Sequence, residues 1–440
     1  MPDLVLNYSE DRSRHRFSVA IGGRIVLPVV SRASGVFVFD TEGREYLDGC
    51  SGAINVNLGH GLPDITKHMH EQIDRVNFVY RTQFRSQPLL ELTERLADLA
   101  PGDLNHVEFT NSGSEGIEMA LRLVTLLHAR KHNPLKCVVL TEEPSYHGMT
   151  AGALGASGHP LRRKDLQSLL ANQATVTRVR PKNGALRASV EDWQEAVDRI
   201  GPARLGAVII EPVGGAASGA APCDPEVLRF LRHAADEQRF VLVADEVMTG
   251  MGRTGRWFGC DHADITPDVM VLGKGISAGY AAISAVLISD RIVRALDRPV
   301  SSLVFGHTMA GAPLAAAAAL AVTEYLVTHD LAARAAVAGE HLAGLLEQLC
   351  RRHPLVKDVR GTGLQRGLGL HGDPERFPGI SLDLTEAARA KGLLVYPAGC
   401  TPVTESVLIA PPLTSTDAEL DELVRRLDGA LSCLSPTPGS

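Results

Sequence analysis

The sequence predicts an α/β fold in which helices cover both faces of a mostly parallel sheet, followed by a smaller α+β domain. Short apolar segments such as Val269–Leu272 alternate with longer segments of helical periodicity. This alternation is typical of a parallel sheet that is buried on both faces. A smaller set of strands and helices follows residue 350, and we expect it to form the second domain.

The elements of this fold can be assigned in order along the chain. A hairpin is expected first, with strands at 36–39 and 44–47 around a four-residue turn. The large domain should hold helices at 63–75, 88–99, 113–130, 189–199 and 224–238, and strands at 106–109, 137–140, 207–210, 240–244, 269–272 and 283–288. Residues 312–350 are helical and lead to strands near 356–360, 365–370, 393–396 and 406–410 and to helices near 382–391 and 415–432.

This pattern divides the chain into three parts. We expect an N-terminal segment, 1–55, that packs with the small domain, a large domain at 56–315, and a small C-terminal domain at 316–440. In an open parallel sheet, ligands bind at the carboxyl ends of the strands. Polar motifs that follow predicted strands are therefore the candidates for function.

The composition restricts the class of protein. The 440 residues are 45% hydrophobic and 22% charged, with a net charge of −7, which favours a globular enzyme over a nucleic-acid-binding protein. The longest apolar run, 312–322, contains a proline and is too short to cross a bilayer. The N-terminus shows no secretion signal, and the seven scattered cysteines form no zinc motif. We expect a cytoplasmic protein without a metal site.

Gly250, Gly252 and Gly255 match the G-x-G-x-x-G fingerprint of dinucleotide-binding proteins. However, residues 245–249 separate them from the preceding strand, and no amphipathic helix follows, so the required tight turn is misplaced. We predict that these glycines shape a loop, in which Arg253 forms a salt bridge. A nicotinamide-dependent oxidoreductase remains the alternative that this motif suggests.

The segment Asn111-Ser-Gly-Ser-Glu115 lies between a predicted strand and a predicted helix. Gly113 lets the backbone approach an anion, and Ser114 adds a hydroxyl donor to the N–H groups of the first helical turn. Such a helix N-terminus can hold a phosphate. The alternative is simple capping, with Ser112 or Ser114 as the N-cap and Glu115 in the first turn.

Two charged residues follow apolar strands of the same sheet. Asp245 would be a carboxylate near the buried floor of the sheet, where it needs a partner such as a protonated ring nitrogen; it could instead cap the next turn. Lys274 would be a desolvated amine that forms a Schiff base, or a solvated loop residue. A phosphate cradle, a carboxylate and a lysine together suit pyridoxal phosphate, which has a phosphate, a basic ring nitrogen and an aldehyde.

The chain resembles the class III aminotransferases, of the omega or ornithine/GABA type, from Val36 to about Leu431. The most specific part of the resemblance is residues 245–255. The other matching motifs occur in family order: Asn-Ser-Gly-Ser-Glu at 111–115, Tyr146-His147-Gly148, Glu211-Pro212, Pro267-Asp268, Gly273-Lys274-Gly275, Gly306-His-Thr308 and Pro411-Pro-Leu413. The resemblance implies the fold type I architecture of pyridoxal-phosphate enzymes, with a seven-stranded sheet, and a homodimer with shared active sites.

The resemblance also implies roles for the residues that contact the cofactor. Lys274 would form the Schiff base and transfer the proton, while Asp245 would keep the ring nitrogen protonated. The ring would lie between Tyr146 and Val247. The phosphate would be held by Gly113 and Ser114 of one subunit and by Thr308 of the neighbouring subunit.

Two further residues of the motifs have less specific roles. His147 would contact the cofactor, or would be a hydrogen-bonded loop histidine. Glu211 would face the cofactor or the substrate, and in part of the family it pairs with an arginine that gates dual substrate recognition.

One departure from the family concerns substrate binding. Many relatives have an arginine near the position of residues 407–410, or in the loop before it, which binds the α-carboxylate of the substrate. The stretch 398–410 has no arginine. Arg366 is a candidate replacement, although a structural role suits it better.

These features predict an aminotransferase that moves an amino group from an amine or amino-acid donor to a keto-acid or aldehyde acceptor by a ping-pong mechanism. An aminomutase of the glutamate-1-semialdehyde type and a dialkylglycine-type decarboxylase are alternatives that use the same cofactor. A non-catalytic protein of the same fold is a further alternative, against which the presence of Lys274 and Asp245 argues.

Overall fold

The centre of the molecule is a seven-stranded sheet with the order β4-β10-β9-β8-β7-β5-β6. Its strands are β4 (His106–Thr110), β5 (Val138–Glu142), β6 (Val176–Val179), β7 (Leu205–Ile210), β8 (Val241–Asp245), β9 (Val269–Leu272) and β10 (Ser284–Ile288). All neighbouring pairs are parallel except those of β10, which runs antiparallel to β4 and β9. The computed structural model describes residues 27–171, 175–296 and 306–434.

Helices cover both faces of this sheet because alternate side chains of a strand point to opposite sides. In β8, Val241 and Val243 pack into the cluster that contains helix α4 (Gly113–Arg130). Leu242 and Ala244 pack into the opposite cluster, with helix α9 (Pro225–Gln238). Both faces are therefore apolar, which explains why the strands are almost wholly apolar in sequence.

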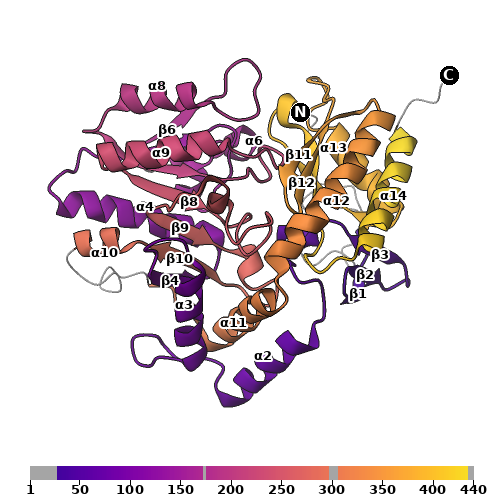
Figure 1. The fold of residues 1–440 in the computed structure, drawn as a ribbon, viewed down its shortest axis with the longest axis horizontal. Coiled ribbons are helices and arrows are strands. Elements are labelled where there is room, and N and C mark those ends of the chain that lie inside the picture. Colours follow the sequence, from indigo (N-terminus) through magenta and orange to yellow (C-terminus); the bar gives the residue numbers. More distant parts are fainter. Residues whose placement is uncertain (1–26, 172–174, 297–305, 435–440) are drawn as a thin grey trace, which may run out of the picture.

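The other helices of the large lobe surround this core (Figure 1). Helices α2 (Pro63–Arg75) and α3 (Gln87–Leu99) pack on α11 (Pro313–Thr328). The remaining helices are α5 (Ala151–Ala156), α6 (Pro160–Arg163), α7 (Gln167–Leu170), α8 (Val190–Ile200) and α10 (Asp290–Leu296), while the short α1 (Ser51–Ile54) belongs to the N-terminal segment. Short 3₁₀ turns span Gly259–Ala263, Lys274–Ile276 and Pro402–Thr404.

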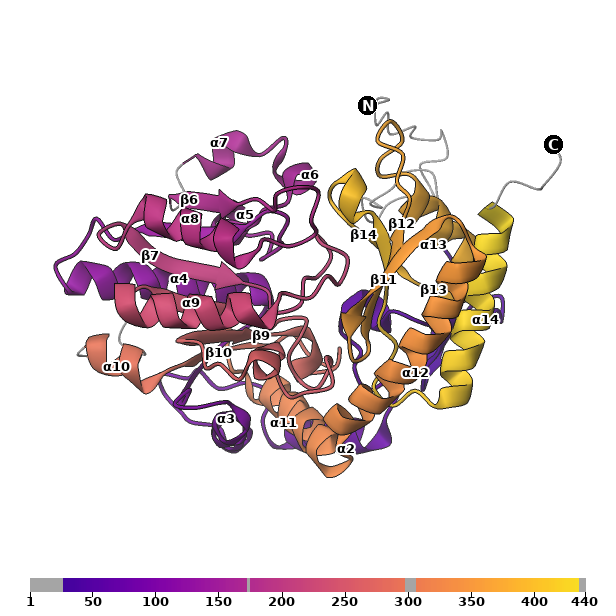
Figure 2. The same cartoon turned by 45° about the horizontal axis from the view of Figure 1, so that its top comes forward.

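The small lobe is an antiparallel sheet with three helices beside it (Figure 2). The sheet has the order β11-β12-β15-β14, and its strands are β11 (Val356–Thr362), β12 (Gln365–Leu370), β14 (Tyr396–Ala398) and β15 (Ser406–Ile409). The helices are α12 (Leu331–Arg352), α13 (Ile380–Ala390) and α14 (Asp417–Leu434). Contacts join α12 to β11 and α13 to α14, so the lobe is an α+β unit.

A third sheet joins the N-terminal segment to the C-terminal part of the chain. It contains β1 (Val30–Ser34), β2 (Phe37–Asp40), β3 (Glu45–Asp48) and β13 (Leu393–Leu394). Strands β2 and β3 form the predicted hairpin, and β13 pairs with β3 in parallel. Residues 1–26, the first part of the predicted N-terminal segment, lie outside the described residues.

The fold class predicted from the sequence is confirmed, and three local expectations need correction. The single strand expected at 393–396 is two strands, β13 and β14, which belong to different sheets. The helical stretch 312–350 is divided between α11 and α12, because Asp330 has a left-handed backbone with φ 45°. Strand β6 was not predicted, since its four residues include polar Thr177 and Arg178.

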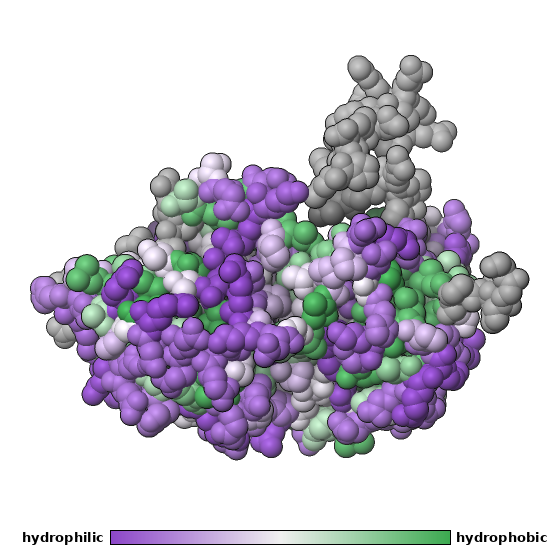
Figure 3. All heavy atoms as spheres, turned by 90° about the horizontal axis from the view of Figure 1, so that it is seen from above, coloured by the Kyte–Doolittle hydropathy of each residue, from purple (hydrophilic) through white to green (hydrophobic). Residues whose placement is uncertain are grey.

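Hydrophilic residues cover much of the face seen in Figure 3, and hydrophobic residues occur between them in separate patches. Within the described ranges, no helix is both long and apolar enough to span a lipid bilayer.

Candidate active site

A cavity of about 320 Å³ lies at the carboxyl ends of the central strands. The loops after β4, β5, β7, β8 and β9 all contribute to it, as expected for a parallel sheet. Its walls include every residue predicted for the site except Thr308: Gly113, Ser114, Tyr146, His147, Glu211, Asp245, Val247 and Lys274. The structure thus brings together residues that lie up to 161 positions apart (113 to 274).

Lys274 follows β9 and Gly273 and enters the cavity from its floor. Its backbone is left-handed, with φ 43°, a conformation that is costly for a residue with a side chain and is often found at functional sites. Burial lowers the pKa of Lys274 to about 8, although Asp245 and Glu211 favour the charged amine. A larger fraction of this amine is therefore neutral and nucleophilic at physiological pH than of a solvated lysine.

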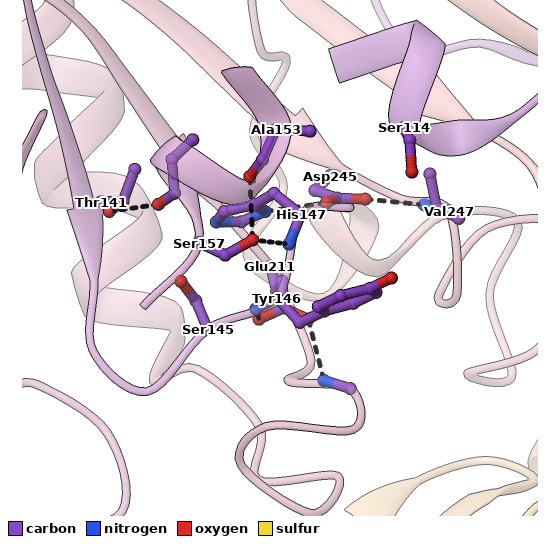
Figure 4. Close-up of polar contacts among 12 residues, drawn as sticks. Ser114, Thr141, Ser145, Tyr146, His147, Ala153, Ser157, Glu211, Asp245 and Val247 are labelled. Atoms are coloured by element: carbon purple, nitrogen blue, oxygen red, sulfur yellow. Dashed lines mark hydrogen bonds and ion pairs between the residues drawn. The ribbon is translucent and has the colours of Figure 1, made fainter. Parts of the chain in front are cut away.

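Asp245 ends β8 and is held by two donors (Figure 4). The Nδ1 of His147 donates to Oδ2 over 2.8 Å, and the backbone N–H of Val247 donates to Oδ1 over 3.2 Å. The side chain of His147 is fully buried. Burial disfavours its charged form, but the hydrogen bond to Asp245 and the nearby carboxylates outweigh burial and raise the pKa of His147. His147 is thus hydrogen-bonded and also lines the cavity.

The N-terminus of α4 combines capping with an open cradle. Ser112 is the N-cap, and its side chain accepts a hydrogen bond of 3.2 Å from the backbone N–H of Glu115. Gly113 packs on Val247 so closely that a Cβ at Gly113 would lie 2.8 Å from a methyl carbon of Val247. Ser114 accepts a hydrogen bond of 3.1 Å from the N–H of Met149, which leaves its hydroxyl proton for another acceptor. The capping and phosphate-binding interpretations of this motif are therefore compatible.

Glu211 follows β7, and backbone groups hold its carboxylate. It accepts hydrogen bonds from the N–H of Tyr146 over 3.2 Å and from the N–H of Gly215 over 3.0 Å. Burial raises the pKa of Glu211, and Asp245 adds to this effect. The guanidinium of Arg187 donates to the carbonyl oxygen of Glu211 and pairs with Glu142. In the described part of the chain, no arginine pairs with the carboxylate of Glu211.

Arg253 differs from its predicted role. It is fully buried, and its guanidinium donates to four neutral oxygens: the carbonyls of Leu364 and Pro411, the hydroxyl of Ser51 and the side-chain carbonyl of Asn57. The predicted salt bridge is therefore wrong. The side chain of Arg253 lies in the junction between the lobes, where the backbone carbonyls of Leu364 and Pro411 accept its hydrogen bonds.

The glycines around Arg253 shape a loop, as predicted. Residues 250–254 form successive turns and Gly255 lies in the bend that follows; Gly252 and Gly255 have φ of 85° and 87°. Arg366 is a structural residue, since it donates to the carbonyls of Gly339, Gly361 and Gly363. Thr308 is exposed and does not line the cavity of its own chain.

Several residues of the cavity wall were not found by sequence reasoning. Ala53, Asn55, Val213, Met248, Ser277 and Ala281 also line the cavity. Their residue types carry no chemical signal, and only their position in the fold brings them here. Within the described ranges, no group of three or more His, Cys, Asp and Glu residues is arranged to hold a metal ion.

Comparisons with known proteins agree with this arrangement. The family model for "Aminotransferase class-III" matches residues 19–431. An uncharacterised aminotransferase, YodT of Bacillus subtilis, is 36% identical over 413 residues, covering 90% of this chain and 93% of YodT. The putrescine aminotransferase of Pectobacterium atrosepticum is 32% identical, covering 96% and 86% of the two chains.

Solved structures show the same likeness in three dimensions. An (S)-enantioselective omega-transaminase from Thermomicrobium roseum superposes with a TM-score of 0.86 at 31% identity, covering 96% of this chain and 97% of that one. A family match along most of the chain, relatives above 30% identity and a shared fold all agree: the chain belongs to the class III aminotransferase family.

Proposed function

We propose that the cavity binds pyridoxal phosphate and that this aminotransferase uses it to move an amino group from a primary amine to a keto acid such as pyruvate. The protein is a class III aminotransferase; the proposal concerns its cofactor, its residues and its substrates. The main support is that Lys274, Asp245 and the N-terminus of α4 line one cavity.

The side chains in the cavity fit the three reactive groups of this cofactor. Gly113 and Ser114 offer backbone N–H groups and a hydroxyl proton at a helix N-terminus, which suit a phosphate. Each oxygen of the Asp245 carboxylate accepts one hydrogen bond from the protein, so lone pairs remain for a ring N–H. Lys274 supplies an amine whose pKa is lowered by burial to about 8.

Bound pyridoxal phosphate would supply an aldehyde that takes up the amino group and a ring that accepts the electrons released at the neighbouring carbon. Lys274 would take the proton from the carbon that bears the amino group of the donor and return it as the acceptor is aminated. Asp245, oriented by His147, would hold a proton on the ring nitrogen by keeping a negative charge beside it. Tyr146 and Val247 would hold the ring from its two sides.

The choice of substrates follows the relatives. The putrescine–pyruvate aminotransferase of Pseudomonas aeruginosa is 29% identical to this chain, and the taurine–pyruvate aminotransferase of Bilophila wadsworthia is 28% identical. Both names join an amine that has no α-carboxylate with pyruvate. This agrees with the lack of an arginine in residues 398–410. We further propose that the enzyme is a homodimer whose active sites are shared.

A panel of amine donors with pyruvate tests this function. The purified enzyme should form alanine together with the carbonyl product of the donor, and absorbance should report conversion of the cofactor. A product with the amino group moved within one molecule would instead indicate an aminomutase, and released carbon dioxide would indicate a decarboxylase. Absence of any amino transfer across the panel would contradict the proposal.

The covalent attachment can be tested separately. Borohydride reduction of the holoenzyme should fix the cofactor on the peptide that contains Lys274, as peptide mass spectrometry would show. Lys136 is the matched control, because burial also lowers its pKa. Its Nζ donates to the carbonyl of Gln238 and it does not line the cavity, so its peptide should carry no cofactor. Lys274→Ala should lose turnover by about 10⁴-fold or more, since it removes both the attachment and the proton transfer.

A further inference from the structure

Arg162 is a cation beside the cavity for which no residue of the described ranges supplies a carboxylate. It lies in the short helix α6, and its side chain is half-buried. The guanidinium carbon stands 4.3 Å from the centre of the ring of Tyr146, and Tyr146 lines the cavity. A guanidinium over an aromatic face is held by the cation–π attraction while its N–H donors remain available at its edge.

Three other arginines near the site, Arg178, Arg187 and Arg253, already have acceptors. Arg187 pairs with Glu142, and Arg178 donates to the carbonyls of Ser157 and Gly155. The two terminal nitrogens of Arg253 donate to neutral oxygens in the junction between the lobes. Arg162 differs from these three arginines because its guanidinium interacts with the side chain of Tyr146 and, within the described ranges, has no carboxylate or backbone carbonyl as acceptor. N–H donors therefore remain for an anion that enters from solution.

The charge of Arg162 acts on two groups, Lys274 in the cavity and Cys400 in the 398–406 loop. After burial, it is one of the causes that lower the pKa of Lys274. It also opposes the burial that raises the pKa of Cys400 to about 12. Cys400 belongs to the 398–406 loop, in which this sequence has no arginine. Arg162 thus places a positive charge near the amine of Lys274 and near the loop that has no arginine.

We propose that Arg162 binds the carboxylate of the keto-acid acceptor and thereby sets the preference of this enzyme for keto acids over uncharged aldehydes. The proposal rests on the proposed aminotransferase function and names the residue that selects its acceptor. A guanidinium forms two parallel hydrogen bonds with a carboxylate. Because the amino-acid product keeps the carboxylate of the keto acid, the same residue would bind that product in the reverse reaction.

The test compares two acceptors in the holoenzyme with one amine donor. We expect Arg162→Ala to lower kcat/KM for pyruvate, relative to kcat/KM for butanal, by roughly ten- to a hundredfold, the loss expected for a charge-assisted hydrogen bond. The change should appear in KM more than in kcat. Arg162→Lys, which keeps the charge but not the planar fork, should retain part of the preference.

The exposed neighbour Lys164 supplies the matched control. Lys164→Ala removes one positive charge two residues away and should leave the ratio of the two acceptors unchanged. The test compares kcat/KM for pyruvate with kcat/KM for butanal. A loss of activity caused by a displaced Tyr146 lowers both values and therefore cancels in their ratio.

Two results would overturn the inference and leave the proposed function intact. One is an equal change for pyruvate and butanal in Arg162→Ala, and the other is no change for either acceptor. If the wild-type enzyme transfers an amino group to neither acceptor, the proposed function itself fails. The wild-type measurement therefore separates the two failures.

Discussion

Lys274 combines a costly backbone with a buried amine, and both follow from its place at the end of β9. Gly273 packs closely on Val247: a Cβ at Gly273 would lie 3.1 Å from a methyl carbon of Val247. The 3₁₀ turn that follows begins at Lys274, which has φ 43°. Such a conformation persists only where the surrounding structure enforces it. The result is an amine held at the floor of the cavity rather than in solvent.

The lowered pKa of Lys274 predicts how the apoenzyme takes up its cofactor. Only the neutral amine attacks an aldehyde, and burial lowers the pKa of this amine from 10.5 to about 8. The rate at which pyridoxal phosphate is captured should rise about tenfold per pH unit below this pKa and level off above it. Stopped-flow absorbance of the apoenzyme would measure the profile. A profile that levels off only near the pKa of a solvated lysine would contradict the burial of this amine.

The same shift affects stability in a defined direction. The pKa of Lys274 in the folded protein, about 8, lies below its value of 10.5 in the unfolded chain. Between these values the unfolded chain binds more protons than the folded protein, so this lysine makes stability rise with pH in that window.

Asp245 allows a second prediction for a single residue. Asp245→Asn keeps the shape of the side chain but removes the charge that would hold a proton on the ring nitrogen, and kcat should fall by roughly 10²–10⁴. Asp268→Asn is the control, because Asp268 is equally buried but pairs with Arg232 and Arg291 outside the cavity. It should lower the denaturation midpoint and leave kcat unchanged. Nearly normal kcat in Asp245→Asn would mean that Asp245 only caps a turn.

At the scale of elements, the sequence predicts what local periodicity determines and misses what distant contacts determine. The apolar strands β7, β8 and β9 are visible in sequence because both of their faces are buried. Strand β13 is not, because its two residues become a strand only by pairing with β3, which lies more than 340 positions earlier in the chain. Periodicity carries no information about such a partner.

The loop after β8 shows how a motif can be interpreted correctly while one of its residues is not. Residues 245–249 separate Gly250, Gly252 and Gly255 from the preceding strand, which argues against a dinucleotide turn, and the structure shows successive turns there. The partners of Arg253 come from residues near 51, 57, 364 and 411. A prediction of those partners needs the packing of three separate segments, which no local pattern contains.

The packing of this loop on α12 leads to a prediction for the element. A Cβ at Gly255 would lie 2.9 Å from the Cα of Ala336, and its φ is 87°. Gly255→Ala should therefore cost about 1–2 kcal/mol for the left-handed backbone and a further ~1–3 kcal/mol for overpacking. Gly43→Ala is the matched control, since Gly43 has φ 81° and open space around it. Urea denaturation should show a lower midpoint for Gly255→Ala than for Gly43→Ala; equal midpoints would mean that α12 shifts freely.

At the scale of the whole molecule, the cavity is built from the large lobe and the N-terminal segment. The large lobe provides the catalytic candidates, while Ala53 and Asn55 from the N-terminal segment complete the cavity wall. Arg253 joins that segment to the small lobe through Asn57 and Pro411. The motif residues of the cavity could therefore be proposed from the sequence. The other residues of its wall, such as Ala53 and Asn55, could not, because only the folded chain brings them to the cavity.

One predicted residue, Thr308, remains outside the cavity of its own chain. It follows Gly306 and His307, and the Nδ1 of His307 lies 4.0 Å from Oε2 of Glu115 in the first turn of α4. The threonine itself is exposed. This position suits a residue that contributes to the phosphate site of a neighbouring subunit in the homodimer that we propose.

Mixing two inactive variants tests whether the active sites are shared. Lys274→Ala removes the reactive amine, and Thr308→Phe would block the phosphate site that this threonine enters. If Thr308 serves the partner subunit, a heterodimer of the two variants has one site with both lesions and one intact site. Complete random exchange of subunits should then restore about a quarter of wild-type activity, because half of the dimers are mixed and each has one working site. Each variant mixed with itself under the same conditions is the control. If Thr308 serves its own chain, every site carries a lesion and no activity returns, and the shared active site must be abandoned.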